Sequence, residues 1–202
     1  MRKFNRAGEP AVVQANCTKW NTQWVASCGS GTSPAFKWYT LEGKTAREHF
    51  MPALREQTQR HCSFCDGFPI EGVSNETVEH FKPKTKFPEH AYTWANLYYC
   101  CNACQSAKRE HWDSLLLHAD AEDYSFARYF EFDFTTGQIR PNSLAAESDK
   151  QRAEITIRLY GLDSQSRRRN RQLEARKCSR SKVDPVQIDE YAYRDFIAPA
   201  QT

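Results

Sequence analysis

The spacing of hydrophobic positions predicts a helix near the amino-terminal end of the chain. Hydrophobic residues recur at intervals of four, three and four, which is one face of a helix, and they are Val13, Cys17, Trp20 and Trp24. Glu9-Pro10 precedes them, and proline is favoured in the first helical turn. Because aromatic residues on such a face are usually buried, we expect both tryptophans in the core. The alternative is that they stack on nucleic-acid bases.

A second helix is indicated by a capping signal. Thr45-Ala46-Arg47-Glu48 has the spacing of a capping box, so this helix is expected to begin at Ala46. Pro52 interrupts the pattern, and either the helix kinks there or a new helix begins. The turn-forming residues Gly29 to Pro34 predict a loop between the two helical regions.

Strict alternation appears further along the chain. Phe130, Phe132 and Phe134 alternate with acidic residues, Thr135-Thr136-Gly137 supplies a turn, and Gln138-Ile139-Arg140 can return as a strand. This pattern predicts a β-hairpin.

Helical patterns follow the hairpin. One helix is expected from about residue 149 to 160, ended by Gly161. Asp163 or Ser164 is expected to cap a long basic helix that runs towards Cys178 and is broken at Asp184-Pro185. Residues 186–202 are expected to form a final helix or a docking segment.

Composition fits a folded chain of one domain with appended parts. Of 202 residues, 40% are hydrophobic and 13% aromatic, which argues against disorder. We divide the chain into an amino-terminal helical extension (1–60), a central core (61–115), and a hairpin with basic helices (116–202). The net charge of +3 does not by itself indicate a nucleic-acid partner. Neither an apolar run long enough for a membrane helix nor a signal peptide is seen, so we expect a cytoplasmic protein without membrane contact.

Two cysteine pairs of matched spacing lie in the central part. Cys62 and Cys65 form one C-x-x-C unit, and Cys101 and Cys104 form another after 35 intervening residues. In a reducing compartment such pairs indicate a tetrahedral zinc site, and four thiolates leave no open position, so this zinc is expected to be structural. The alternatives are free thiols in a core or a redox pair. Cys100 could replace Cys101, whereas we interpret three unpaired cysteines as buried thiols: Cys17, Cys28 and Cys178.

The residues between the pairs carry further motifs. Glu79-His80-Phe81-Lys82-Pro83-Lys84 is followed by Trp94-Ala95-Asn96-Leu97, and Cys101-x-x-Cys104-Gln105-x-x-Lys108 closes the stretch. Together they resemble the HNH endonuclease family, most closely the PtuB-like subgroup associated with retrons and the Septu anti-phage system. The resemblance implies an α+β protein: a ββα-metal nuclease core with four-cysteine zinc knuckles, surrounded by helices and a hairpin. It also implies a catalytic Mg²⁺ or Mn²⁺ ion and hydrolysis of phosphodiester bonds.

The resemblance assigns roles by position. His80 matches the general base, and a neutral imidazole with a pKa of about 6.5 suits that role. Glu79 matches an acidic ligand of the catalytic metal, and Asn96 matches an asparagine that orients His80 through a hydrogen bond. Gln105 stands where the family usually has an Asn or His ligand, and His111 is the alternative ligand. Because neighbours on an ideal strand face opposite sides, Glu79 and His80 can share a site only where the strand ends or bulges.

Basic residues suggest how a substrate is held. Lys82, Lys84 and Lys86 lie beside His80 in the sequence and are expected to touch the phosphodiester backbone. Lys108 is expected to meet a phosphate or to cap its helix. The basic helix could follow phosphates through Arg167, Arg168 and Arg171, but it could equally be a solvated face or a dock for an acidic partner.

The resemblance also implies partners: a DNA or RNA substrate and a PtuA-like ATPase, with a retron complex of reverse transcriptase and ncRNA/msDNA as one setting. The protein would be the toxic effector of an anti-phage defence system. A G-x-x-x-x-G-K phosphate-binding loop is not found, so ATP chemistry must come from another chain. The rival hypothesis is a non-catalytic zinc-knuckle module that binds nucleic acid or a partner.

Overall fold

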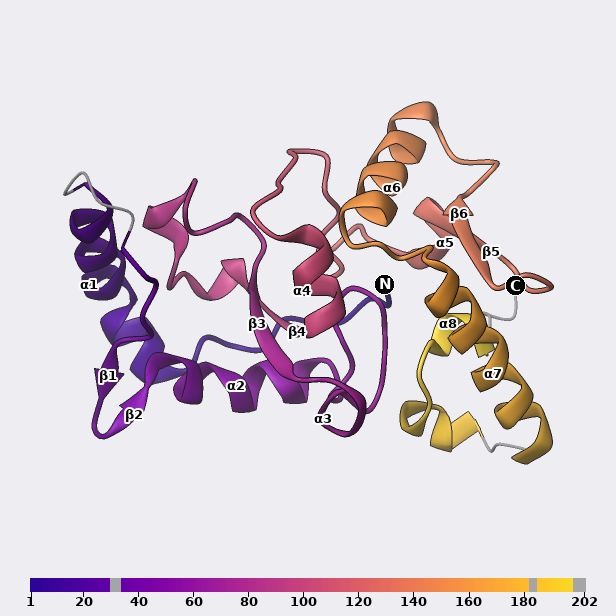
Figure 1. Ribbon diagram of the computed structural model, residues 1–202, viewed down its shortest axis with the longest axis horizontal. Coiled ribbons are helices and arrows are strands. Elements are labelled where there is room, and N and C mark those ends of the chain that lie inside the picture. Colours follow the sequence, from indigo (N-terminus) through magenta and orange to yellow (C-terminus); the bar gives the residue numbers. More distant parts are fainter. Residues whose placement is uncertain (30–33, 182–184, 198–202) are drawn as a thin grey trace.

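The structure is a computed structural model in which residues 1–29, 34–181 and 185–197 are described. Over these residues the chain is α+β, with three two-stranded antiparallel sheets set among helices (Figure 1). The strand pairs are β1 (Thr40–Leu41) with β2 (Lys44–Thr45), β3 (Glu76–His80) with β4 (Leu97–Cys101), and β5 (Phe130–Asp133) with β6 (Gln138–Pro141). The helices are α1 (Ala11–Cys28), α2 (Ala46–Gln57), α3 (Ile70–Val73), α4 (Asn102–Lys108), α5 (Phe126–Tyr129), α6 (Glu147–Leu159), α7 (Gln165–Ser181) and α8 (Arg194–Ile197). Short 3-10 turns are η1 (Pro88–His90), η2 (Trp94–Asn96) and η3 (Pro185–Glu190).

Helix α1 uses its predicted face for packing. Val13, Trp20 and Trp24 are buried, and the Trp20 ring packs edge-on against Phe50 of α2. The prediction that the tryptophans belong to the core is confirmed, and base stacking on them is excluded by their burial. Cys17 is only half-buried, as are the other two unpaired thiols predicted to be buried, Cys28 and Cys178.

Helix α2 begins as its capping box predicts. The Thr45 side chain accepts a hydrogen bond from the Glu48 N–H, and the Glu48 carboxylate accepts one from the Thr45 N–H. The helix continues through Pro52, so the alternative of a second helix starting at that residue is wrong.

The predicted hairpin is confirmed as β5 and β6, in a register that sets Phe130 opposite Pro141. Helix α6 ends before Gly161, whose φ of +59° is the left-handed conformation that favours glycine. Parts of three predicted features lie outside the described residues: the loop at 29–34, the break at Asp184-Pro185, and the final segment at 186–202. The described part of that final segment forms the short helix α8, and it also docks, because Arg194 of that helix pairs with Asp66.

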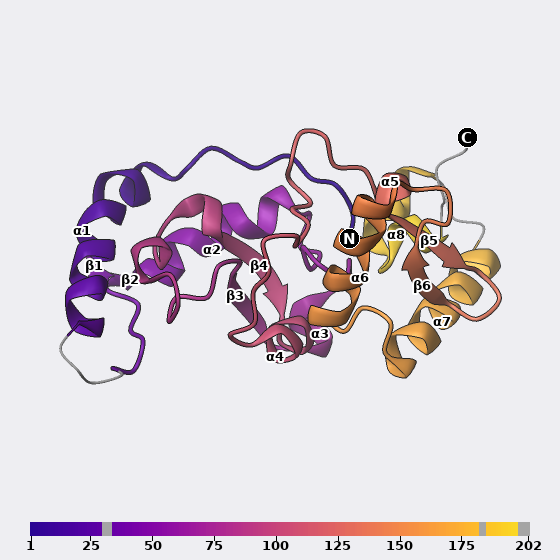
Figure 2. The ribbon, with the colours of Figure 1, turned by 90° about the horizontal axis from the view of Figure 1, so that it is seen from above.

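The elements lie in sequence along the long axis of the molecule. Helix α1 is at one end, β3, β4 and α4 are near the middle, and the hairpin and α7 are at the other end (Figures 1 and 2). The amino-terminal segment runs beside them, because Met1 accepts a hydrogen bond from Tyr124 and Ala7 accepts one from Trp94. Buried residues from Met1 to Leu162 form one hydrophobic cluster, so all three predicted segments contribute to a shared core.

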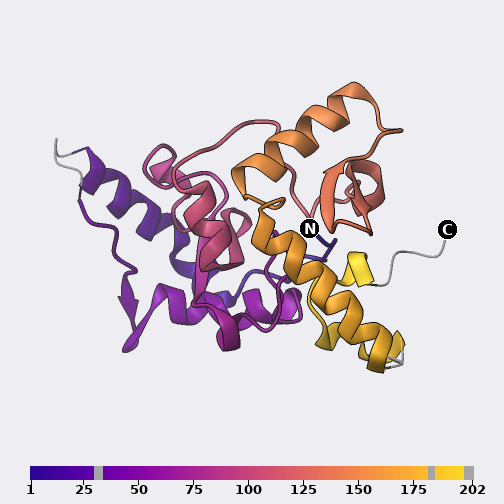
Figure 3. The same cartoon turned by 45° about the vertical axis from the view of Figure 1, so that its right-hand side comes forward.

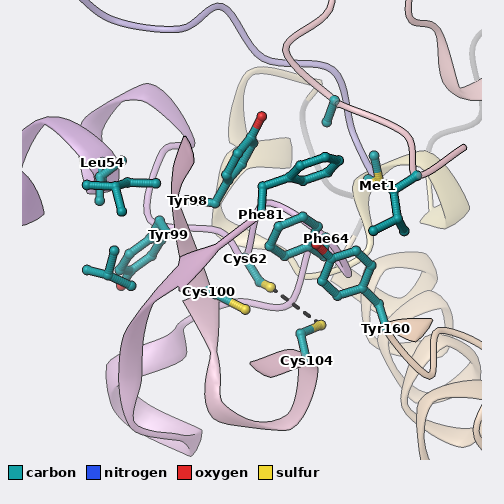
Figure 4. Close-up of a cluster of buried hydrophobic side chains, with 14 of the residues drawn as sticks. Met1, Leu54, Cys62, Phe64, Phe81, Tyr98, Tyr99, Cys100, Cys104 and Tyr160 are labelled. Atoms are coloured by element: carbon teal, nitrogen blue, oxygen red, sulfur yellow. Dashed lines mark hydrogen bonds between the residues drawn. The ribbon is translucent and has the colours of Figure 1, made fainter. Parts of the chain in front are cut away.

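Part of this core surrounds the cysteine pairs. The rings of Phe64 and Tyr160 stack with centroids 3.9 Å apart, and Tyr98 of β4 packs against Phe64 (Figure 4). Among the described helices, none combines the length and the apolar character that crossing a membrane requires.

Candidate metal centre and catalytic pocket

Four cysteines converge from a loop, a strand and a helix. Cys62 and Cys65 lie in a tight loop after α2, closed by hydrogen bonds from Cys62 N–H to Gly67 and from Asp66 N–H to Cys62. Cys101 is the last residue of β4, and Cys104 lies in the first turn of α4. The side chains of Cys62 and Cys104 point towards each other (Figure 4).

The sulfur geometry fits a tetrahedral metal ion. The Sγ atoms of Cys62 and Cys104 are 3.7 Å apart, as are those of Cys65 and Cys101, and all four lie within 4.8 Å of one another. A zinc ion bonded to sulfur at about 2.3 Å sets its four ligands roughly 3.8 Å apart. Cys100 stays outside this group, with its thiol directed to the Cys101 carbonyl, so the alternative pairing through Cys100 is wrong.

A buried arginine supports an anionic cluster. Arg167 of α7 donates from Nη2 to the Cys104 sulfur at 3.1 Å, and its Nη1 has no hydrogen-bond partner. Burial lowers the pKa of this guanidinium, but the negative sulfurs of Cys104, Cys65 and Cys101 outweigh burial and raise it. No carboxylate of the described residues pairs with Arg167, so its charge is best balanced by thiolates in the cluster, the form that binds zinc. The pKa of Cys101 is lowered to about 4, whereas burial raises that of Cys104. The cysteine cluster can hold a metal ion such as zinc.

A separate pocket of about 200 Å³ lies at the end of β3. Because the strand ends at His80, the side chains of Glu79 and His80 line the same pocket although they are neighbours. From the sequence, these two neighbours could share a site only at a strand end or bulge, and the strand does end there. The remaining lining residues are Pro83, Lys84, Gln105, Arg109 and Glu110.

The imidazole of His80 is held in one tautomer. Its Nε2 lies 2.9 Å from the Ala91 carbonyl, which can only accept, so Nε2 carries the proton. The ring also stacks on Trp38 and meets Phe36 edge-on. Burial, with the charge of Lys84, lowers the pKa of His80 to about 3. The ring is therefore neutral at cellular pH, with a free lone pair on Nδ1.

Glu79 and Lys108 form a buried ion pair. Nζ of Lys108 lies 2.6 Å from Oε1 of Glu79 and 2.9 Å from the His80 carbonyl, and the lysine is 0% exposed. Burial raises the pKa of Glu79 to about 7, although the Lys108 charge opposes that shift. The prediction that Lys108 meets a phosphate is wrong, because its ammonium is enclosed and already bonded.

Gln105 faces the pocket from α4. Its Nε2 donates to the Val78 carbonyl at 3.0 Å, which leaves the amide oxygen as the free end of the side chain. His111 is exposed and does not line the pocket, so the geometry favours Gln105 over His111 as a second ligand.

Asn96 acts on a loop rather than on the imidazole. Its Oδ1 accepts from the Lys82 N–H, and its Nδ2 donates to the carbonyls of Lys82 and His90. The expected direct hydrogen bond to His80 is therefore wrong: both donors of the amide are used on the backbone. Since His90 precedes Ala91, Asn96 fixes the loop whose carbonyl orients His80.

The predicted substrate-binding cations fall into two groups, the lysines that follow His80 and the arginines of α7. Lys84 lines the pocket, Lys86 is exposed, and Lys82 is half-buried with its ammonium over the rings of Phe87 and Trp112. The prediction that the arginines of α7 follow phosphates is wrong for two of them, because Arg167 and Arg171 are buried.

The two buried arginines bond to other parts of the protein. Arg171 donates to the carbonyls of Gly137 and Leu162, and Arg167 bonds the cysteine cluster. Arg168 is partly exposed and paired with Asp163.

Sequence reasoning missed three features of the pocket. Arg109 and Glu110 line it just after α4, and the Ala91 carbonyl sets the His80 tautomer. The position of Arg109 directly after the last motif was a usable signal. The role of Ala91 had none, because a backbone carbonyl leaves no trace in residue type.

No family model matches the chain, and a search of the curated proteins finds no match. The resemblance to the HNH endonucleases therefore stays a prediction, supported by the motifs and by the geometry of the pocket.

Proposed function

We propose that this chain is a metal-dependent endonuclease of the HNH type, which hydrolyses phosphodiester bonds in nucleic acid. One observation carries the proposal: Glu79 and His80 share a pocket with Gln105, and the His80 tautomer leaves Nδ1 free to accept a proton. A neutral imidazole with a free nitrogen can take the proton of an attacking water molecule.

The local fold supports this proposal. Strands β3 and β4 pair along their whole length, from Glu76 opposite Cys101 to His80 opposite Leu97, and α4 follows β4 directly. This strand–strand–helix order is what a ββα-metal core requires, with the candidate base on β3 and the candidate ligand Gln105 on α4.

The donor set suits a hard divalent cation. Oε2 of Glu79 is not used by Lys108, and the amide oxygen of Gln105 is free, while Mg²⁺ commonly takes one or two protein oxygens and completes its shell with water and phosphate. A Mg²⁺ or Mn²⁺ ion held by these residues would stabilise the charge that develops on the phosphate. Lys84 and Arg109 line the same pocket and could contact the substrate, although Glu110 also lines it and lies 3.9 Å from the Lys84 ammonium.

The four cysteines would hold a structural zinc ion. With four thiolates the coordination shell is full, so this ion has no position for substrate. Its binding would contribute on the order of 10 kcal/mol to folding. Arg167 and the knuckle residue Asp66 would connect this ion to the carboxyl-terminal helices.

By the same resemblance, we propose a cytoplasmic effector of an anti-phage defence system, controlled by a PtuA-like ATPase, with a retron complex as its setting. The support is the motif pattern between Cys62 and Lys108.

A second candidate function is a non-catalytic zinc-knuckle module that binds nucleic acid or a partner. One observation favours it: Lys108 occupies an oxygen of Glu79, the only predicted acidic ligand. In this alternative Lys108 replaces the cation.

The ligand assignment gives a direct test. The zinc-loaded chain would be incubated with mixed DNA and RNA, with or without Mg²⁺ or Mn²⁺. We expect cleavage only with a divalent ion, its loss in Gln105→Ala, and near wild-type rates in His111→Ala. Cleavage that survives Gln105→Ala but not His111→Ala would overturn the ligand assignment. Absence of cleavage with either ion would favour the binding module.

A further inference from the structure

The outer face of α7 carries exposed arginines, whereas the arginines of its inner face are buried. Arg169, Arg176 and Arg180 are exposed, and none of them takes part in a hydrogen bond or ion pair among the described residues. On a helix, positions separated by seven and eleven residues lie on one line, here about 16 Å long. Helix α7 runs along the outside of its end of the molecule (Figure 3). Since the three arginine side chains are exposed, they form a row on this helix that faces solvent.

This row borders a groove between α7 and the turn of the hairpin. Two adjoining hollows of about 440 Å³ and 360 Å³ share Gln172 and Arg176, and together we call them the α7 groove. Its lining includes no carboxylate among the described residues, and the full set is Phe134, Thr135, Thr136, Gln165, Arg168, Arg169, Gln172, Leu173, Ala175, Arg176, Ser179 and Arg180.

The hairpin wall of the groove is held firmly. Gln172 donates to the Thr135 carbonyl at 2.6 Å, and Arg171 donates to the Gly137 carbonyl at 2.6 Å. A Cβ atom on Gly137 would lie 2.4 Å from the Arg168 carbonyl oxygen, so only glycine allows this approach. The groove therefore exists before any ligand binds, which limits the entropy lost on binding.

An aromatic ring stands at one end of the groove. Phe134 is 55% exposed, and one side of its ring is stacked on Phe196 with centroids 5.2 Å apart. Because one side of this ring is packed and the rest is exposed, a nucleic-acid base can stack on it. Stacking of this kind is worth about 1–3 kcal/mol.

We propose that the α7 groove binds single-stranded nucleic acid, with phosphates along Arg169, Arg176 and Arg180 and one base stacked on Phe134. This rests on the proposed nuclease function and names the strand form that the enzyme holds. Charge complementarity and the aromatic platform support it together: guanidinium groups without a partner among the described residues attract phosphates of any sequence, and every base has a face for stacking. An acidic protein partner is the other occupant, and the experiment separates the two.

The test measures binding without cleavage. A labelled oligothymidylate of about 20 nucleotides would be titrated with the full chain by fluorescence anisotropy, without Mg²⁺ or Mn²⁺, between about 50 and 200 mM salt. Changing Arg169, Arg176 and Arg180 to Gln should weaken binding at least about tenfold. It should also reduce the slope of log affinity against log salt by about 2, from about 0.7 per lost phosphate contact. Changing three exposed cations elsewhere to Gln (Lys19, Lys44 and Arg60) should leave the slope nearly unchanged.

The aromatic contact has its own signature. Phe134→Ala should weaken binding about fivefold or more without changing the salt slope, while Leu144→Ala, at another exposed apolar residue, should have no effect. Circular dichroism would confirm that each variant is folded. Wild-type affinity in the triple-arginine variant overturns the proposal, and so does absence of oligothymidylate binding by the wild type, which would point to an acidic protein.

Failure of the groove proposal can be distinguished from failure of the nuclease proposal. His80-dependent cleavage with no effect of the arginine variants on binding removes the groove proposal and leaves the nuclease intact. Binding that depends on the groove, with no cleavage under any divalent ion, supports the groove and removes the nuclease.

Discussion

At the scale of single residues, the pocket combines an imidazole and a carboxyl group whose surroundings differ. His80 is buried among aromatic rings and donates to one carbonyl, so its neutral form is favoured. Glu79 is equally buried but lies against an ammonium group, which supports its charged form. Removal of Lys108 would leave a carboxylate enclosed without a partner, and such a charge is costly.

The Lys108–Glu79 pair is expected to be a point of fragility. Lys108→Met should lower the free energy of unfolding by about 3–5 kcal/mol, since it breaks a buried ion pair from one side. The double variant Lys108→Met/Glu79→Gln should recover part of that loss. Urea denaturation would measure all three proteins, with Lys86→Met as the exposed control, expected within about 0.5 kcal/mol of wild type. A Lys108→Met protein as stable as this control would contradict the structural role of the lysine.

At the scale of elements, the basic helix α7 is attached to the cysteine cluster. Arg167 reaches Cys104 across 63 positions of sequence, and Arg194 of α8 makes a buried pair with Asp66 in the first cysteine loop. Tyr193 also donates its N–H to the Asp66 carbonyl. The Arg167 guanidinium therefore lies against the sulfurs that would bind the metal and offsets part of their negative charge.

Arg167 is therefore expected to stabilise the bound metal. Release of zinc to a chromophoric chelator should be roughly tenfold faster in Arg167→Met, since a hydrogen bond to a charged group is worth about 1.5–3 kcal/mol. Arg169→Met, on the exposed face, should release zinc at the wild-type rate. Stripping the metal should also increase amide hydrogen exchange in α7. Equal release from both variants would show that Arg167 does not act on the metal centre.

The features that the sequence predicted correctly depend on neighbouring residues, whereas the roles of Lys108 and Arg167 depend on partners far away in the sequence. Capping boxes, alternation and C-x-x-C units are read within a few residues, so α2, the hairpin and the four cysteines were all found. Lys108 and Arg167 were misassigned because their partners are 29 and 63 positions away. In α7 arginines occupy both faces, so composition alone could not separate the buried Arg167 and Arg171 from the exposed ones.

At the scale of the whole molecule, a partly buried polar network joins the amino-terminal segment to the core. Arg6 pairs with Asp120 at 2.6 Å, and the Tyr98 hydroxyl donates to Asp120 and accepts from Nδ1 of His118. Burial lowers the pKa of His118; Asp120 opposes this shift, whereas the charges of Arg6, Arg152 and Lys82 add to it. The Phe81 ring covers the imidazole.

The contribution of His118 to stability should consequently fall on acidification below about pH 6.5, the ordinary pKa of histidine. In that window this histidine binds more protons in the unfolded chain than in the folded one, because its folded pKa is lowered, so its contribution to the free energy of unfolding rises with pH. His118→Asn should remove this contribution between about pH 7 and 5 in denaturation measured at several pH values; His80, whose pKa is also lowered, acts in the same direction, whereas Glu79, whose pKa is raised to about 7, acts in the opposite one. An unchanged slope would contradict the role given to His118.

The central claim is that His80 is the base of a metal-dependent nuclease whose cysteine cluster only supports the fold. The most direct measurement is the single-turnover rate of nucleic-acid cleavage with Mg²⁺ or Mn²⁺ in wild type and His80→Ala, with zinc content determined for both. We expect one zinc ion per chain in each protein and a rate about 10²–10⁴-fold lower in His80→Ala. Equal rates in two proteins with equal zinc content would contradict the account.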